Sequence, residues 1–124
     1  MVALARAREL PATQLAHPFG PEWDVFTVAG KIFLLATAEP GGRDEERRIV
    51  NLKVDPADSE ALRAEFAAIT PGFHMNKRHW ISVYPSPDIP SDLVRDLVTE
   101  SYLLVVAGLP KARRPVDPAT FRLA

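Results

Sequence analysis

Between positions 74 and 80 the chain carries a cluster of side chains that can bind an anion or stack on a base. The segment reads His74-Met75-Asn76-Lys77-Arg78-His79-Trp80. Its lysine and arginine suit phosphate, and its two histidines add donors that are cationic when protonated. The asparagine can donate a hydrogen bond, and Trp80 can stack on a base. This chemistry predicts electrostatic contact with nucleic-acid phosphates.

Two lysines elsewhere, Lys31 and Lys53, extend this patch if their strands lie beside it. The alternative is a solvated turn in front of a strand, with Trp80 packed on the sheet. Basic clusters are common on protein surfaces, so the residues alone favour the solvated turn. The predicted nucleic-acid site therefore depends on which of these strands are neighbours.

The histidines also suggest metal binding or acid–base catalysis. His74 and His79 are five residues apart, so on a strand their side chains point to opposite sides. A zinc or catalytic site would need the distant Asp55, Asp58 or His17. The chain has no Cys, which excludes thiolate catalysis and Cys-based metal sites. We therefore predict a protein without enzymatic activity, metal or cofactor.

Ser101-Tyr102, in the last predicted helix, is the remaining pair with chemical potential. A nucleophilic serine needs a base and an oxyanion hole, and the G-x-S-x-G turn does not occur in the sequence. Neither phosphate-binding glycine motif, Walker A or G-x-G-x-x-G, occurs either. We predict that Ser101 allows close helix packing and that Tyr102 edges the core with its hydroxyl at the surface.

The composition bounds the class of protein. The 124 residues fit one domain, 1–124, in which 111–124 form a basic, proline-broken tail partly ordered through Val116, Phe121 and Leu123. The net charge of −1 argues against a strongly basic nucleic-acid-binding protein, so a local patch must carry any such contact. The apolar run from Tyr102 to Leu109 is too short to span a membrane. The absence of Cys suits a reducing compartment, and we expect a cytoplasmic protein.

The first half of the chain predicts one helix and three strands. The helix spans residues 2–10 and ends at Pro11, and residues 12–18 read as irregular. Two strands, 23–28 and 31–37, are joined by a turn at Ala29-Gly30. A third strand, 49–54, alternates apolar and polar residues, which places Asn51 and Lys53 on the face away from the core. The segment 39–48 reads as an exposed hairpin tip.

The second half predicts a helix, two strands and a longer helix. Asp55 caps a helix that begins at Pro56, carries Leu62, Phe66 and Ile69 on one side, and stops at Pro71-Gly72. Residues 73–77 suggest a short strand and 79–84 a clearer one. Ser91 reads as the N-cap of the last helix, which ends at Gly108 and Pro110. The order α-β-β-β-α-β-β-α with short turns indicates an antiparallel α+β fold.

Several motifs of this sequence occur together and in the same order in a known family. They are Pro18-Phe19-Gly20, Val28-Ala29-Gly30-Lys31-Ile32-Phe33, Asn51-Leu52-Lys53-Val54-Asp55-Pro56, the segment 74–80, and Ser101-Tyr102 with the apolar run behind it. On these residues the chain resembles the MmcQ/YjbR family over roughly residues 10–110. The resemblance implies a fold similar to that of secretion chaperones, and DNA binding through a proposed double-wing motif. The chaperone-like fold equally suggests a protein or peptide partner at a sheet edge or apolar patch.

Overall fold

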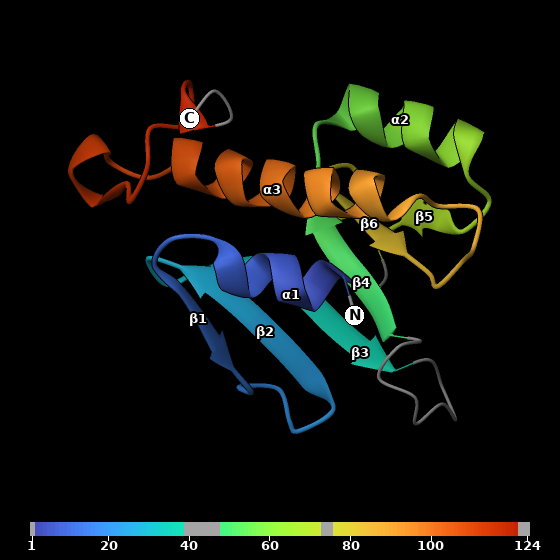
Figure 1. Cartoon of the computed structure of the whole chain (residues 1–124), viewed down its shortest axis with the longest axis horizontal. Helices are drawn as coiled ribbons and strands as arrows, with labels where there is room; N and C mark the ends of the chain where they lie inside the picture. Colours follow the sequence, from blue (N-terminus) through green and yellow to red (C-terminus); the bar gives the residue numbers. More distant parts are fainter. Residues whose placement is uncertain (1, 39–47, 73–75, 122–124) are drawn as a thin grey trace.

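A computed structural model of the chain describes residues 2–38, 48–72 and 76–121. The helices in these ranges are α1 (Val2–Glu9), α2 (Pro56–Glu65) and α3 (Ser91–Ala107), followed by a 3-10 turn at Lys111–Arg113. The strands are β1 (Thr13–Ala16), β2 (Trp23–Val28), β3 (Lys31–Ala38), β4 (Arg48–Lys53), β5 (Ile69–Pro71) and β6 (Trp80–Val83). They form one antiparallel sheet in the order β1-β2-β3-β4-β6-β5 (Figure 1). The predicted α+β class is thereby confirmed.

Strand β1 makes the element order one strand longer than predicted. The expectation of an irregular segment at residues 12–18 is wrong, because Thr13–Ala16 pairs with β2 over four residues. Most β1 side chains are exposed, so no apolar alternation marks the strand in the sequence. This segment forms a strand because its backbone groups pair with those of β2, a neighbour that local sequence patterns do not indicate.

The segment after α2 also differs from the prediction. Asp55 caps α2 as expected, accepting a hydrogen bond from the Ala57 N–H at 2.9 Å. The helix ends at Glu65, and Ile69 lies in β5 opposite Val83 of β6. The expected continuation to Pro71-Gly72 is wrong, because pairing with β6 satisfies these backbone groups instead.

Two smaller predictions for the second half of the chain concern the start of α3 and the strand expected at 73–77. The N-cap of α3 is Pro90, so Ser91 is the first helical residue rather than its cap. Of the strand expected at 73–77, residues 73–75 lie outside the described part of the chain, and Asn76 and Lys77 lie in the turn that precedes β6.

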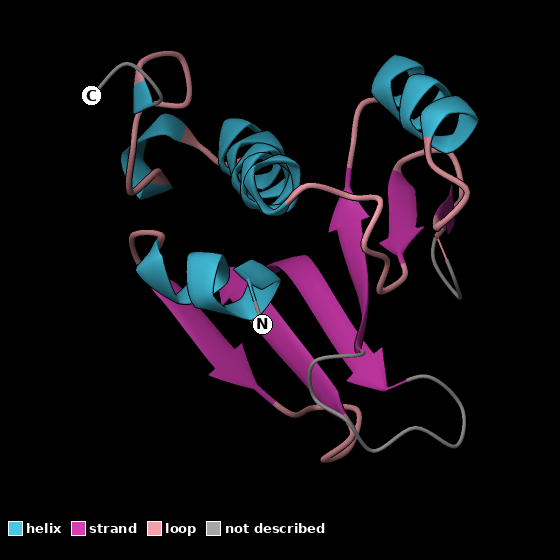
Figure 2. Cartoon of the chain, turned by 45° about the vertical axis from the view of Figure 1, so that its right-hand side comes forward, coloured by secondary structure: helices cyan, strands magenta, loops and turns pink. Residues whose placement is uncertain are grey.

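Helix α3 packs in the angle between the two halves of the sheet and contacts strands of both halves. Figure 2 looks along α3 and shows β1, β2 and β3 on one side of the helix and β4, β6 and β5 on the other. Helix α1 packs beside α3 over the first half, and α2 lies next to β5. The largest fully buried side chains of this core include Phe26, Phe33, Leu34, Leu52, Ile81 and Tyr102. One face of both halves is therefore covered by the helices.

The two halves of the sheet are joined at their divergence by Ser101. Pairing between β3 and β4 runs from Ala38↔Arg48 to Leu34↔Leu52, and next to it β3 carries a bulge that leaves Phe33 without a register partner. The buried Ser101 hydroxyl donates to the Phe33 carbonyl at 2.6 Å and accepts from the Lys53 N–H at 2.8 Å. A side chain of α3 thus replaces the next rung of the β-ladder.

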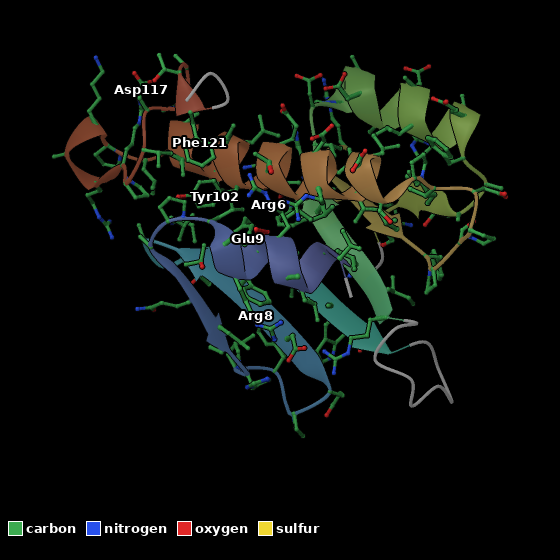
Figure 3. The ribbon with its side chains drawn as sticks, in the orientation of Figure 1. Arg6, Arg8, Glu9, Tyr102, Asp117 and Phe121 are labelled. Atoms are coloured by element: carbon green, nitrogen blue, oxygen red, sulfur yellow. The ribbon has the colours of Figure 1, made fainter. Side chains whose placement is uncertain are left out.

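Tyr102 is buried, in contrast to the expectation that its hydroxyl reaches the surface. It is 0% exposed, and its hydroxyl donates to the Pro11 carbonyl at 2.6 Å. Its ring meets Phe33 edge-on at 5.4 Å between centroids and lies beside Phe121 at 6.2 Å (Figure 3). Burial raises the pKa of Tyr102 to about 12. The α1–β1 connection and the C-terminal segment cover this residue, and neither is adjacent to it in sequence.

The face of β4 that points away from the helices is also buried at Asn51. The alternation of apolar and polar residues predicts an exposed face there. Asn51 and Ser82 are paired across β4 and β6 and are both 0% exposed. The Ser82 hydroxyl donates to Asn51 Oδ1 at 2.6 Å, and Asn51 Nδ2 donates to the Leu35 carbonyl at 3.4 Å. The expectation of a half-buried strand is therefore wrong at Asn51, because β4 is central in the sheet and its polar residue is satisfied by neighbouring strands.

Ser101→Ala is expected to destabilise the fold markedly. The change leaves the Phe33 carbonyl and the Lys53 N–H buried without their hydroxyl partner, at a cost of about 1–3 kcal/mol for an unsatisfied group. Denaturant unfolding followed by circular dichroism measures this cost. Ser91→Ala, at an exposed position that makes no side-chain cap, is the matched control and is expected to stay close to wild type. Equal stability of the two variants would contradict the bridging role.

Tyr102 is expected to make stability fall at alkaline pH. Its folded-state pKa of about 12 lies above the unfolded value of 10.0, so its contribution is complete below pH 10.0 and is lost as pH rises towards 12. A shift of two units corresponds to about 2.7 kcal/mol. The difference in unfolding free energy between wild type and Tyr102→Phe should therefore shrink across this window, while all other titrating groups cancel. A difference that is independent of pH would show that the hydroxyl is not buried.

Candidate nucleic-acid interface

The basic segment forms an exposed turn that leads into β6. The Asn76 side-chain oxygen accepts from the Arg78 N–H at 3.0 Å, and the His79 N–H donates to the Asn76 carbonyl at 3.2 Å. These bonds fold the segment back on itself, as asparagine side chains commonly do in turns. The side chains of Lys77, Arg78 and His79 are all exposed. His74, the remaining member of the predicted cluster, lies outside the described residues.

Lys53 and Trp80 lie next to this turn as a cross-strand pair. They are register partners in β4 and β6, and the Val54 N–H donates to the His79 carbonyl at 2.9 Å just beyond them. Their neighbours Leu52 and Ile81 face the helix-covered core, so Lys53 and Trp80 face the opposite side of the sheet. Both side chains are half-buried. The structure therefore gathers the described members of the predicted site, except Lys31, at one end of β4 and β6.

Lys31 is separated from this group. It begins β3 and pairs with Val28 across the tight Ala29-Gly30 turn, where both turn residues have positive φ angles. Val28 packs in the helix-covered core, so its register partner Lys31 projects on that same side. Lys53 projects on the other side. Lys31 thus shares an end of the sheet with Lys53 but not a face.

Other basic side chains are engaged in holding the fold together. Arg114 donates to the Leu109 carbonyl at 2.9 Å and to the Ala107 carbonyl at 2.8 Å, which satisfies the C-terminal end of α3. Arg113 donates to the Ala29 carbonyl at 3.3 Å. Val116 and Phe121 pack against the core, as the sequence predicts, whereas Leu123 lies outside the described residues.

Two helices are likewise joined through arginine side chains on the surface. Arg95 of α3 donates to Glu9 of α1 at 3.2 Å, and Arg6 donates to the Thr99 hydroxyl at 2.9 Å. Figure 3 shows Arg6 and Glu9 on α1, next to α3. Arg6 and Arg95 therefore stabilise the contact between α1 and α3 and are not part of the basic turn.

A partly buried cluster of polar side chains that the sequence does not predict lies at the opposite end of β4. Asp24 of β2 accepts from Arg48 of β4 and lies 2.8 Å from His17 Nε2. The Arg48 side chain is 14% exposed, so its assignment to an exposed hairpin tip is wrong. Residues 39–47 of that expected tip lie outside the described residues. The three side chains come from separate segments, so no spacing in the sequence signals their meeting.

The serine and the histidine that the sequence offers as catalytic candidates, Ser101 and His17, lie at separate places in the fold. Ser101 Oγ bonds two backbone groups inside the sheet, as described above. His17 contacts Asp24, not Asp55 or Asp58. Among the described residues, no group of three or more His, Asp or Glu side chains is arranged to hold a metal ion. No helix in the described part of the chain has the length and apolar character needed to cross a membrane.

The fold and its motifs define a small α+β domain, and comparisons with known proteins identify its family. The sequence model of the YjbR family matches residues 8–104, and the chain belongs to this family. The chain is 49% identical over 105 residues to the uncharacterized protein YbdF of Escherichia coli O157:H7, covering 85% of this chain and 82% of YbdF. It is 37% identical over 70 residues to the uncharacterized protein YjbR of Escherichia coli K12, covering 56% and 59% of the two chains.

A solved structure agrees with the architecture. The crystal structure of Deinococcus radiodurans protein DR2400 matches with a TM-score of 0.77 at 34% sequence identity, covering 89% of this chain and 80% of that chain. The family resemblance drawn from the motifs is therefore confirmed, together with the predicted antiparallel α+β architecture.

Proposed function

We propose that this protein is a non-enzymatic, cytoplasmic binding domain that contacts nucleic acid through the turn Asn76–His79. The observation that carries the proposal is the cross-strand pair Lys53–Trp80. It sets a cation and an indole on the sheet face that no described helix covers, next to a turn with three exposed basic side chains. Cations position a phosphate backbone, and an aromatic face accepts a base from an unpaired strand.

The charge of the whole chain limits the strength of this contact. The net charge is −1, so no long-range field draws a polyanion to the domain. Lys53, Lys77 and Arg78 are the permanent cations of the described patch, and Lys31 does not join them. The binding should therefore be weak, independent of base sequence and sensitive to salt.

Fluorescence anisotropy with a labelled DNA duplex tests this proposal. With about three phosphate contacts, affinity should fall about 40-fold between about 50 mM and about 200 mM salt. Lys77→Glu with Arg78→Glu should abolish binding at the lower salt. Lys31→Glu with Lys111→Glu makes the same change in net charge at exposed positions elsewhere and should retain most of it. Undetectable binding by wild type, or equal loss in both double variants, would refute the proposal.

A second candidate function, binding of a protein or extended peptide, is favoured by the edge strand β1. Leu15 is 41% exposed on this strand and Phe19 is 57% exposed just after it. The strand Thr13–Ala16 has neither a charged residue nor a proline, which are the usual protections of a sheet edge. The other edge, β5, is three residues long and ends in Pro71. An extended partner could therefore add to the sheet at β1.

Affinity capture from nuclease-treated lysate tests the second candidate. Wild type should retain a protein partner that Leu15→Lys loses, because a lysine at the edge opposes strand addition. Thr70→Lys on the protected β5 edge is the matched control and should retain the partner. Capture of the same proteins by all three forms, or of none by wild type, would exclude strand addition at β1.

A further inference from the structure

An exposed leucine and an exposed arginine lie close together at the β1 edge of the sheet. Leu15 is the register partner of Phe26 in β2, so both side chains lie on the helix-covered side. The Arg8 guanidinium of α1 lies over the Phe26 ring, 5.9 Å from its centroid (Figure 3). An apolar surface and a cation therefore meet beside the free backbone of β1.

The charge of Arg8 has no carboxylate partner within the described part of the chain. Its sequence neighbour Glu9 lies 3.2 Å from Arg95 and 4.0 Å from Arg6, on the side of α1 that faces α3 (Figure 3). The other ion pairs between described residues are those of Asp24, and none of them includes Arg8. A guanidinium that stacks on a ring keeps its N–H groups available at its edge. Arg8 can therefore still bind a carboxylate.

The backbone of β1 selects an extended polypeptide as the ligand of this edge. In the described sheet β1 pairs with β2 alone, so its outer N–H and C=O groups have no strand partner. An added strand satisfies these groups and directs every second side chain to the helix-covered side, beside Leu15. That strand lies about 10 Å from β2, across two strand spacings, so the longer side chain of glutamate reaches Arg8 better than aspartate does.

A second copy of the chain fits this edge poorly. Two identical antiparallel strands in one sheet are related by a two-fold axis perpendicular to the sheet, which puts the helices of both copies on the same face. The two Arg8 side chains would then lie on one side of the joint and repel each other. Pairing over the four residues of β1 offers little contact area to offset this repulsion. An acidic partner brings the opposite charge instead.

We propose that β1 binds an extended segment of a partner protein that presents apolar residues and a glutamate on one face. The apolar residues pack on Leu15, and the glutamate forms charge-assisted hydrogen bonds with Arg8. The proposal rests on the second candidate function, strand addition at β1, and specifies the sequence that such a partner carries. Three strands separate β1 from β6, so this segment does not compete with a ligand at the basic turn.

The first test compares two peptides on the unchanged protein by fluorescence anisotropy. The probes are Thr-Val-Thr-Glu-Thr-Val-Thr and the same peptide with Gln in place of Glu, both labelled and with neutral ends. Their sequences read the same in both directions, so strand direction does not affect the result. The Glu peptide should bind saturably and the Gln peptide at least about tenfold more weakly, as expected for a charged hydrogen bond.

The outcomes separate this proposal from strand addition itself. Equal affinities of the two peptides, with both lost in Leu15→Lys, would overturn the acidic preference and leave strand addition standing. No binding of either peptide by wild type would contradict both.

The second test locates the carboxylate. Arg8→Gln removes the cation at an exposed position and should lower the affinity for the Glu peptide to that for the Gln peptide, which itself should change by less than about twofold. Lys111→Gln makes the same change of charge at an exposed position of the C-terminal segment and should keep the wild-type preference. A preference for Glu that persists in Arg8→Gln, or that both variants lose equally, would overturn the proposal.

Discussion

The fold depends on one hydroxyl group, Ser101 Oγ, which sits between two diverging strands. Where β3 bulges at Phe33 and β4 ends at Lys53, the backbone groups of the two strands no longer reach each other. The hydroxyl accepts from one strand and donates to the other, so α3 becomes part of the β-ladder. Tyr102 then fixes the same helix turn to the α1–β1 connection through the Pro11 carbonyl. A helix held at these two points keeps the two halves of the sheet at their angle to each other.

This arrangement gives β4 two different chemical ends. Arg48, its first residue, lies on the same face as Val50 and Leu52, and its side chain is paired with Asp24 of β2. Lys53, its last residue, is an odd number of positions away and so projects on the other face beside Trp80. One short strand therefore carries an ion-paired arginine on its helix-covered face and a half-buried lysine on the other face.

Much of the fold is predictable from local patterns. The tight turn at Ala29-Gly30, the cap at Asp55, and the alternation that puts Ile81 and Val83 in the core are all encoded within a few residues. The errors share a different cause. Strand β1, the early end of α2, and the burial of Asn51 and Arg48 each depend on a neighbour that is distant in the chain. Local propensity carries no information about such neighbours.

The sequence by itself determined the class of fold, the family motifs and the identity of the basic turn, because these follow from short-range periodicity, turn chemistry and residue type. Tertiary structure alone decided which cations lie close together. It placed Lys53 beside the turn and Lys31 on the opposite face, because strand register and side-chain alternation set direction. It also converted Ser101 from a small packing residue into a bridge, and it assembled Arg48, Asp24 and His17 from three segments. Such groupings arise only when the sheet forms, since the pairing of distant strands creates them.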